Sequence, residues 1–430
     1  MDRDQQRVIG ILLLIVGAVF YFHSSVYQSY YSHRNDFAHL YLGGYIADRG
    51  GNFFDFNLIW NAKNYLHIPT GLNPFVYPPF FAILLIPLSH FSYNNAWTLF
   101  FVLSHAAYFF SLALIVRSFR REEESAWLWW GGLMALSACF IPLPKTYSAG
   151  QMNTFMLLIL SGGWFLWQRK REAAAGAVIG LGAAIKITPA ILLLYFLWKG
   201  RWRAAAGGFV VIGLSIIISY SCFGAEIHRS FLREARQMSY GSSTWSNLPP
   251  PYDRFNQHYH VEPHNQAPSA LWHRLLTNNP STQGAANSPR TAKAFSYLTA
   301  LAILAALAWG NKLGSGECRI EEYSLWILGM LLLPSLLWDH YLAQAILPIA
   351  AAWRLALDGR SRGLVLLGLS IAIMAIPFLH DHPLYKEGWM TLFMSLKLFA
   401  LLLLGIYFFL NLPNRNAKGK FPCDEYPDFE

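Results

Sequence analysis

A carboxylate follows the first apolar run of the chain. Asp36 stands in HRNDFAHLYLGGYIADRGG, shortly after the apolar residues 8–22. The spacing of Phe37, Leu40 and Tyr41 predicts an amphipathic helix that begins near Asp36. At a helix start an aspartate can cap the free N–H groups, and at a membrane–water boundary it can act as a general base. Both interpretations are open from this residue alone.

Two cations stand where they could bind an anion. Lys186 lies in AAIKITPAILLLYF, and a charge within apolar sequence is a functional candidate by default. Its partner is expected to be an outer carboxylate or a phosphate at the headgroup level. Arg274 lies in HNQAPSALWHRLL, where Asn265 and Gln266 precede a predicted amphipathic helix. An arginine there can bind a phosphate through two N–H groups.

Other polar and aromatic side chains gather at the predicted outer ends of apolar runs. Gln151 and Asn153 follow each other closely in SAGQMNTF, and SLLWDHYL places Asp339 beside His340. Neighbouring residues point in different directions on a helix, so Asp339 and His340 are not automatically a pair. His340 could instead face Asp36 across the bundle, whereas the amides are more often helix-packing groups than ligands.

Aromatic side chains that could stack on a sugar are Tyr77, Trp245 and Trp338. Tyr77 precedes a proline pair that fixes the angle at which the chain enters the membrane.

A metal site is not expected. His258, His260 and His264 lie close together in a proline-rich stretch, but acids at suitable spacing are missing. The four cysteines, at positions 139, 222, 318 and 423, are far apart and indicate neither a disulfide framework nor a zinc knuckle.

The composition indicates the setting of these residues. The chain has 430 residues, of which 54% are hydrophobic and only 13% are charged, which predicts an all-α polytopic membrane protein and excludes a soluble enzyme. The formal net charge of +9 could suggest nucleic acid, but most Lys and Arg residues stand in short clusters at the ends of apolar runs. Such clusters are typical of membrane topology signals, so no nucleic-acid partner is expected.

Seven basic clusters are expected to be cytoplasmic, together with both termini. They centre on residues 3–7, 117–121, 169–171, 199–203, 312–319, 354–362 and 415–420. This requirement predicts spans near residues 8–24, 96–117, 126–142, 151–168, 203–223, 295–311, 322–338, 340–357, 363–379 and 391–410.

Two further apolar segments are too short for ordinary spans. Residues 76–91 contain three prolines and fit a re-entrant or interfacial helix. Residues 173–198 are expected to form two short helices whose tip, at residues 186–189, points outward. The total is about 12 transmembrane or re-entrant helices.

The expected organisation is one integral membrane domain, residues 1–410, with outer segments at 25–95 and 224–294. The latter is rich in Pro, Asn, Ser and aromatic residues and is expected to lie over the outer membrane surface as a long loop. Residues 411–430 are polar and are expected to be a disordered cytoplasmic tail.

Taken together, several motifs resemble glycosyltransferase family 87, whose bacterial members have the GT-C fold and transfer mannose from a polyprenyl-phosphate donor. The motifs are an Asp after the first span, YPP at 77–79, GQxN at 150–153, KxxP at 186–189, RWR at 201–203, NQ at 265–266 with Arg274 downstream, and WxHY at 338–341. This chain departs from the family pattern at Asp339, where a paired histidine is usual, and at Ala267, which follows the NQ pair.

The resemblance implies a single displacement at the outer face of the cytoplasmic membrane of a bacterium, from a polyprenyl-phosphate sugar to a hydroxyl group of a lipid or glycan acceptor. Asp36 would be the general base, with His340 near it. For the same chemistry, Lys186 and Arg274 are the candidates for neutralising the leaving phosphate. No divalent metal is required, because the phosphate is already a stable leaving group. The expected substrate-binding residues are Tyr77, Gln151, Asn153, Asn265, Gln266, Trp338 and Asp339.

Three other classes compete with this hypothesis. A transporter or flippase for a lipid-linked or small polar substrate would use Lys186 and the outer acids as a path, but the sequence has no convincing internal repeat. A membrane acyltransferase would need a buried histidine, and His105, the only histidine in the middle of a predicted span, has no acidic neighbour in sequence. The third class is a non-catalytic membrane scaffold.

Overall fold

The chain folds almost entirely into helices. The computed structural model describes residues 1–32, 34–71, 73–238, 240, 258–313, 319–360, 362–377 and 382–412. Within these ranges the only strands are two-residue segments, β1 (Gln283–Gly284) and β2 (Glu387–Gly388), which pair in parallel. The predicted all-α class is therefore confirmed. Trp245 and nearly all of the predicted tail 411–430 lie outside the described residues.

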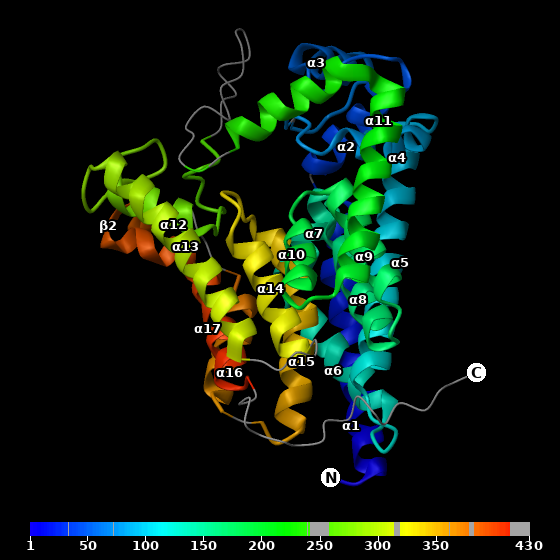
Figure 1. Ribbon diagram of the computed structural model, residues 1–430, viewed down its shortest axis with the longest axis vertical. Coiled ribbons are helices and arrows are strands. Elements are labelled where there is room, and N and C mark those ends of the chain that lie inside the picture. The colour runs from blue at the N-terminus through cyan, green and yellow to red at the C-terminus, as the bar shows by residue number, and fades with distance from the viewer. Residues whose placement is uncertain are drawn as a thin grey trace.

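The first half of the chain forms an upright bundle with a cap at one end (Figure 1). Its upright helices are α1 (Arg3–Tyr21), continued by the π-helical segment η1 (Phe22–Gln28), α5 (Tyr93–Phe119), α6 (Ala126–Cys139), α8 (Asn153–Gln168), α9 (Glu172–Ile185), α10 (Ala190–Trp198) and the first part of α11 (Trp202–Gln237). The cap contains α2 (Asn35–Asp48), α3 (Phe56–Tyr65) and the start of α4 (Pro79–Ser89). A short helix, α7 (Pro142–Ala149), follows α6 after a bend of 69°.

Small residues bring the upright helices into close contact. A Cβ atom at Gly131 on α6 would lie 2.0 Å from the Gly10 carbonyl oxygen on α1, and one at Gly176 on α9 would lie 1.7 Å from the Ala204 oxygen on α11. Glycine is therefore required at both crossings, which is how helices often associate inside a membrane.

The second half of the chain forms the other flank of the molecule. It contains α12 (Pro268–Leu276), α13 (Pro289–Leu313), α14 (Ile320–Leu332), the 3-10 turn η3 (Asp339–Ala345), α15 (Ile346–Leu357), α16 (Leu364–Ala375), η4 (Pro383–Tyr385), η5 (Trp389–Ser395) and α17 (Leu396–Leu410). Helices α14 and α15 lie between the first bundle and α16–α17 (Figure 1).

Among the described residues, five helices are long and apolar enough to cross a membrane, or six if the bent pair α6–α7 counts as one span. They begin at Arg3, Tyr93, Trp202, Pro289 and Trp389. The polytopic character is confirmed, whereas the count of about 12 spanning or re-entrant helices stays a prediction. Residues 173–198 do form two short helices, α9 and α10, separated at Lys186, and the helix in 76–91 has only 11 residues.

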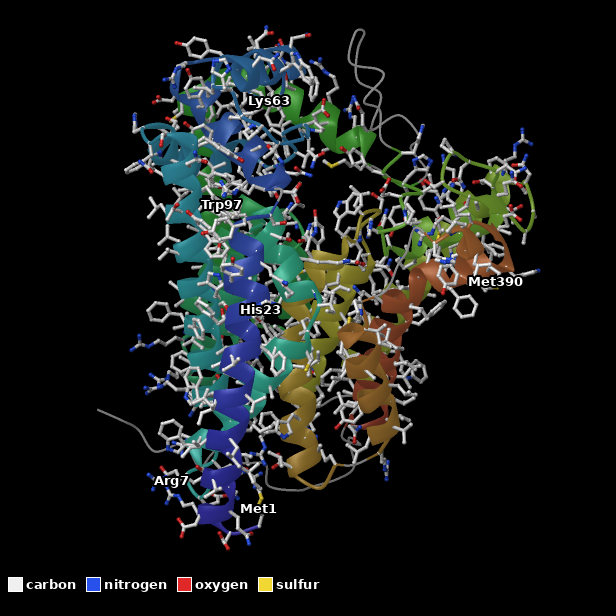
Figure 2. All side chains as sticks on the ribbon, turned by 180° about the vertical axis from the view of Figure 1, so that it is seen from behind. Met1, Arg7, His23, Lys63, Trp97 and Met390 are labelled. Atoms are coloured by element: carbon white, nitrogen blue, oxygen red, sulfur yellow. The ribbon has the colours of Figure 1, made fainter. Side chains whose placement is uncertain are left out.

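The segment that follows residue 223 begins with a helix. A long loop was expected from residue 224 onward, whereas helical structure resumes after Gly224 and ends at Gln237. Gly224 has a φ of 73° and a ψ of −174°, which is not helical, so α11 consists of two helices joined by a kink at this residue (Figure 1). The turned part of α11 contacts the cap, where Phe231 packs against Phe54. Figure 2 shows that Lys63 in this cap and Arg7 in α1 mark opposite ends of the long axis.

Candidate functional site

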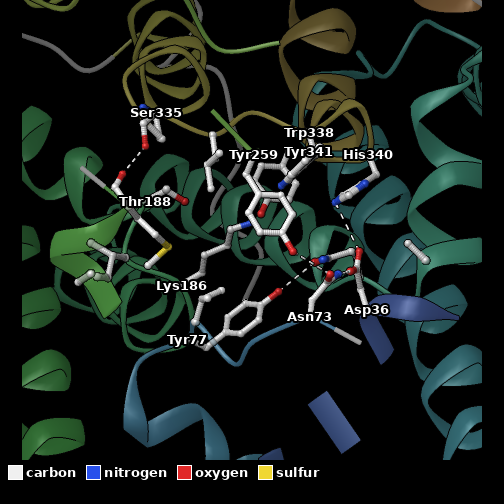
Figure 3. A pocket seen from close by; sticks show the side chains of 18 of the residues that line it. Asp36, Asn73, Tyr77, Lys186, Thr188, Tyr259, Ser335, Trp338, His340 and Tyr341 are labelled. Atoms are coloured by element: carbon white, nitrogen blue, oxygen red, sulfur yellow. Dashed lines mark hydrogen bonds and ion pairs between the residues drawn. The ribbon is translucent and has the colours of Figure 1, made fainter. Parts of the chain in front are cut away.

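A cavity of about 990 Å³ lies between the cap and the two flanks. It is lined by side chains from α2, α7, the turn between α9 and α10, α11, the segment after residue 257, and the turn that leads into η3 (Figure 3). Of the site residues expected from the sequence, the lining includes Asp36, Tyr77, Gln151, Lys186, Trp338 and His340. It does not include Asn153, Asn265, Gln266, Arg274 or Asp339.

Asp36 stands at the start of α2 but does not cap it. The N-cap position is Arg34, which has a φ of 55° and makes no side-chain cap bond. The Asp36 carboxylate instead accepts a hydrogen bond of 2.8 Å from Asn73 Nδ2. With the residue only 9% exposed, its second oxygen faces the cavity side chains. The capping interpretation is therefore wrong.

Two histidines flank this carboxylate. His340 Nε2 lies 3.9 Å from Asp36 Oδ2, and His39 Nδ1 lies 4.0 Å from Oδ1. Burial lowers the pKa of His340 to about 4, although the nearby charge of Asp36 opposes this shift. Burial also lowers the pKa of His39. Both rings are therefore neutral near pH 7. The predicted proximity of His340 to Asp36 is seen, and the contact is one between a carboxylate and a neutral imidazole.

Lys186 lies at the tip between α9 and α10, at the Lys186–Pro189 turn that the sequence indicated. Its Nζ atom lies 3.2 Å from the ring centroid of Tyr341, a close cation–π contact. Among the described residues this buried nitrogen has no hydrogen-bond partner. Burial lowers the pKa of Lys186 to about 7, although the Asp36 carboxylate opposes that shift. A buried cation of this kind is ready to pair with an incoming anion.

The proline pair and the GQxN motif meet at the wall of the cavity. Pro78 and Pro79 begin α4, which places Tyr77 just before the helix. The Tyr77 hydroxyl donates to Gln151 Oε1 at 3.0 Å, and its ring stacks on His39 with centroids 5.9 Å apart. Gln151 follows Gly150, whose φ of 74° ends α7. Asn153 lies behind this wall and accepts a bond from Gln344 at 3.2 Å.

The cavity has an apolar arm next to this polar centre. Its side chains come from α10, α11, α14 and the chain just after α14; they include Ile191, Leu194, Phe209, Met330 and Leu333. One cavity thus combines a carboxylate, a buried amine and a surface suited to a hydrocarbon chain.

Asp339 is held by two lysines rather than pointing into the cavity. Lys145 Nζ from α7 lies 2.6 Å from Asp339 Oδ2, and Lys397 Nζ from α17 lies 3.2 Å from the same oxygen. Lys397 is fully buried. These contacts tie η3, which carries His340, to helices of both flanks. The placement gives no support to the prediction that Asp339 binds substrate directly.

The two ion pairs make a stability test possible. Asp339→Asn leaves the buried Lys397 and the half-buried Lys145 without their shared carboxylate, and breaking a buried pair in this way typically costs about 3–5 kcal/mol. We expect a clearly lower apparent melting temperature for the detergent-solubilised variant. Glu226→Gln, which breaks an exposed pair with Arg229, is the matched control and should change stability by about 0–1 kcal/mol. Equal melting temperatures for the two variants would contradict this role.

Arg274 and the neighbouring amides form hydrogen bonds that connect segments of the second flank. The buried Arg274 guanidinium donates to the carbonyl oxygens of Glu262 (2.7 Å) and Asn265 (2.9 Å) and to Ser395 Oγ (2.7 Å). Asn265 Oδ1 accepts from the backbone N–H of Leu337, and Gln266 Nε2 donates to the Met394 carbonyl. The predictions that these three residues bind substrate find no support here, because their hydrogen bonds go to protein groups and none of the three lines the cavity.

Several side chains of the site were missed from the sequence. Asn73, Tyr259, Tyr341 and His39 all line the cavity; Tyr341 ends the WxHY motif but was not predicted as a site residue, and the other three stand in no pattern that marks them. Lys397 did carry a signal, because MSLKLFALLLL places a charge inside an apolar run. Lys145 carried one as well, since it is a cation on the side opposite the basic clusters.

The histidines of the 258–273 segment lie near one another. The ring centroids of His258 and His260 are 6.3 Å apart, and those of His260 and His273 are 5.8 Å apart. No group of three or more His, Cys, Asp or Glu side chains that could hold a metal ion is found in the described parts of the chain.

Comparison with known proteins identifies relatives of this chain. A polyprenol-phosphate-mannose-dependent alpha-(1-2)-phosphatidylinositol pentamannoside mannosyltransferase of Mycobacterium tuberculosis (strain CDC 1551 / Oshkosh) is 28% identical over 168 residues, which are 35% of this chain and 37% of the relative. A pentamannoside mannosyltransferase of the same name from Mycolicibacterium smegmatis is 28% identical over 207 residues, and the match covers 44% of this chain and 48% of the relative. A phosphatidylinositol mannoside mannosyltransferase of Mycobacterium tuberculosis (strain H37Rv) is 29% identical over 141 residues, 30% of this chain and 33% of the relative.

The matched region thus spans from a third to about half of the length of these relatives. No solved structure matches the chain. The family match contains Tyr77, Gln151 and Lys186, whereas Asp36 and His340 lie outside it, so their roles rest on the geometry of the cavity. The model of glycosyltransferase family 87 matches residues 75–276, and the resemblance indicated by the sequence motifs is confirmed.

Proposed function

We propose that this protein is a membrane glycosyltransferase that moves a sugar, mannose in the first instance, from a polyprenyl-phosphate donor to a hydroxyl group of a lipid or glycan acceptor. The observation that carries the proposal is one cavity in which Asp36, two neutral histidines and the buried Lys186 lie beside an apolar arm. The family match and the donor for which the relatives are named, polyprenol-phosphate-mannose, support the choice of donor.

The donor fits the cavity in one orientation. The polyprenyl chain would occupy the apolar arm between α10, α11 and α14, and the phosphate would lie at Lys186. Charge then develops on the phosphate as the glycosidic bond breaks, and a cation preorganised at that point stabilises the transition state. The sugar would lie between Lys186 and Asp36, beside Tyr77 and Trp338.

The reaction is a single displacement. Asp36 Oδ2 takes the proton of the acceptor hydroxyl as its oxygen attacks the anomeric carbon, and the electron pair of the broken bond leaves with the polyprenyl phosphate. His340 Nε2, neutral and 3.9 Å from Oδ2, is placed to hold the same hydroxyl. The relatives are named for phosphatidylinositol mannosides, so a glycosylated phospholipid is the acceptor class to test first. Neither the leaving group nor the base in this scheme needs a divalent metal.

The test is transfer by the purified protein. Protein in lipid vesicles is incubated with radiolabelled polyprenyl-phosphate mannose and a bacterial lipid extract, with a nucleotide-activated mannose as the alternative donor. We expect a labelled lipid only from the polyprenyl-phosphate donor. Labelling from the nucleotide sugar alone, or movement of unaltered donor across the bilayer without any new product, would contradict the proposal.

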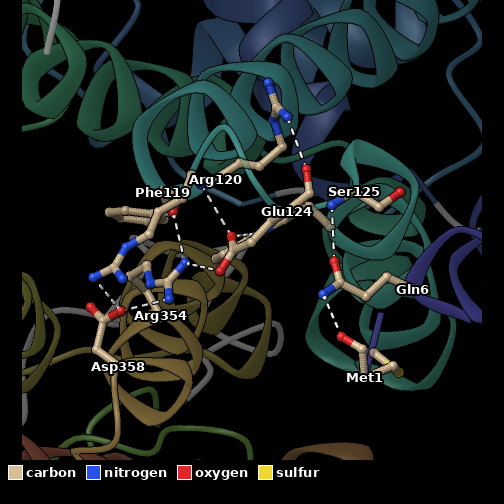
Figure 4. A network of polar contacts seen from close by, with 10 residues as sticks. Met1, Gln6, Phe119, Arg120, Glu124, Ser125, Arg354 and Asp358 are labelled. Atoms are coloured by element: carbon tan, nitrogen blue, oxygen red, sulfur yellow. Dashed lines mark hydrogen bonds and ion pairs between the residues drawn. The ribbon is translucent and has the colours of Figure 1, made fainter. Parts of the chain in front are cut away.

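We also propose that the cavity opens toward the outer face of the cytoplasmic membrane. Basic clusters from distant parts of the chain meet at the opposite end of the molecule. There Arg354 pairs with Glu124 at 2.6 Å and with Asp358 at 2.6 Å, close to the N-terminal residues of α1 (Figure 4). Lys199 pairs with Glu322 at 2.6 Å. A concentration of Lys and Arg at one end favours its retention in the cytoplasm.

This orientation is tested by cysteine labelling in intact cells. In a background without the four native cysteines, Tyr65→Cys on the exposed cap should react with an impermeant maleimide, because residue 65 would face outward and is 75% exposed. Arg7→Cys should react only after the cells are opened. The reverse pattern would place the cavity on the cytoplasmic side.

A further inference from the structure

The Asp36 carboxylate is held by a relay of two side chains from distant parts of the sequence. Asn73 Nδ2 donates to Asp36 Oδ1 at 2.8 Å, and the Tyr259 hydroxyl donates to Asn73 Oδ1 at 3.0 Å (Figure 3). A phenol O–H next to an amide oxygen fixes which way the amide faces, because only the oxygen can accept that proton. Tyr259 therefore keeps the NH₂ group of Asn73 turned toward Asp36.

The relay distinguishes the two oxygens of the carboxylate. Oδ1 is occupied by Asn73, whereas Oδ2 lies 3.9 Å from His340 Nε2, beyond the 2.5–3.2 Å of a hydrogen bond. A hydroxyl oxygen can lie about 2.8 Å from both of these atoms at once, since twice that distance exceeds their separation. An acceptor hydroxyl can therefore contact Oδ2 and the imidazole at the same time.

Tyr259 is itself fixed to the element that carries His340. Its ring meets Trp338 edge-on, with centroids 5.7 Å apart and planes at 90°. Asn265, six residues after Tyr259, donates to the Tyr259 carbonyl at 3.0 Å and forms a backbone bridge with Trp338. One packed unit therefore places both the imidazole on one side of the hydroxyl site and the relay that sets the carboxylate on the other.

We propose that Asn73 is a positioning residue that presents Asp36 Oδ2 to the acceptor hydroxyl, with Tyr259 fixing the orientation of the Asn73 amide. The inference rests on the proposed function, because it assigns a role in the same reaction. Without Asn73, the carboxylate can rotate and exchange its two oxygens, so the productive geometry is present for only part of the time. Small displacements of a reacting group are costly even when every catalytic residue remains.

The test uses variants of the full-length protein in vesicles, with polyprenyl-phosphate mannose as donor. Asn73→Ala should lower kcat about 10–100-fold and leave the donor KM within about twofold, because the donor phosphate lies at Lys186 and not at Asn73. Tyr259→Phe, which removes a single oxygen and should fold normally, is expected to lower kcat by a smaller factor. Asn73→Asp keeps the shape of the side chain but presents a second carboxylate to Asp36, so its kcat should fall at least as far as that of Asn73→Ala.

Asn52→Ala is the matched control. Asn52 lies in the same outer segment and ties it to α11 by donating to Ser230 Oγ at 3.2 Å, but it does not line the cavity. It should lower thermal stability and leave kcat near that of the wild type. A wild-type kcat in Asn73→Asp or Asn73→Ala would overturn the proposal, as would a Tyr259→Phe enzyme of full activity. If the wild-type protein itself transfers no sugar, the proposed function fails instead.

Discussion

An Asp36→Asn protein is expected to lose sugar transfer by about 10²–10⁴-fold while it still binds the donor, because the loss of a general base typically has an effect of this size. The asparagine keeps the size of the side chain and an oxygen that can accept the bond from Asn73. The helix should be unaffected, since the N-cap position is Arg34. Steady-state transfer from labelled polyprenyl-phosphate mannose measures the first effect, and donor binding in vesicles measures the second.

His340→Ala should cause a smaller loss in the same assay, because the imidazole holds the hydroxyl but does not take its proton. Asp48→Asn is a suitable control: this acid also lies on α2, but its partners are Arg49 and Ser89, and it does not line the cavity. Near wild-type turnover in Asp36→Asn would show that another group is the base. Glu262, whose side chain lines the same cavity, would then be the next residue to test.

Donor affinity is expected to depend on Lys186 and therefore on pH. Lys186→Met removes the cationic side chain proposed to bind the phosphate. Hydrogen bonds to a charged group contribute about 1.5–3 kcal/mol, so Kd for the donor should rise by about 10–150-fold. The pKa of Lys186 is lowered to about 7 in the unliganded protein, so the amine is charged below that pH and neutral above it. An anionic ligand stabilises the charged form and raises the pKa in the complex.

The sign of the pH effect follows from these two states. As the pH rises above about 7, the free protein loses the proton that the complex keeps, so the apparent affinity should fall by up to about tenfold per pH unit until the pKa of the complex is reached. The groups that face Lys186 are Asp36, His340 and Tyr341. Burial lowers the pKa of His340 to about 4 and raises that of Tyr341, so neither ring titrates in this window.

Lys186→Arg provides the control, because a guanidinium stays charged throughout this range. Donor Kd measured between pH 6 and 9 should rise for the wild type and stay flat for the arginine variant. A flat profile for the wild type would show that Lys186 keeps its proton in the free protein. An unchanged Kd in Lys186→Met would remove this residue from the donor site altogether.

The sequence predicted the parts of the site that carry a charge in unusual surroundings. Asp36 follows the first span and Lys186 interrupts an apolar run, and the structure brings both into one cavity. The break between α9 and α10 was predictable too, because each half is too short to span and a proline follows the lysine.

Other features depend on contacts between distant segments and carry no local signal. Asn73 is one amide in a polar loop until the fold brings Tyr259 to it across 186 residues. Arg274 resembled a phosphate ligand because its type suits that role, but its bonds to Glu262, Asn265 and Ser395 make it a structural residue of the second flank. The helix between Gly224 and Gln237 was missed because residues 224–294 were treated as one loop; Gly224, with its positive φ, is the kink at which the first part of α11 ends.

The most direct test of this account is the anomeric configuration of the product. Purified protein is given a polyprenyl-phosphate mannose of known configuration and a glycosylated phospholipid acceptor, and the new glycosidic bond is analysed by NMR. A single displacement with Asp36 as the base predicts a product of inverted configuration, formed by the wild type and not by Asp36→Asn. A product of retained configuration, or one formed equally well by Asp36→Asn, would contradict the account.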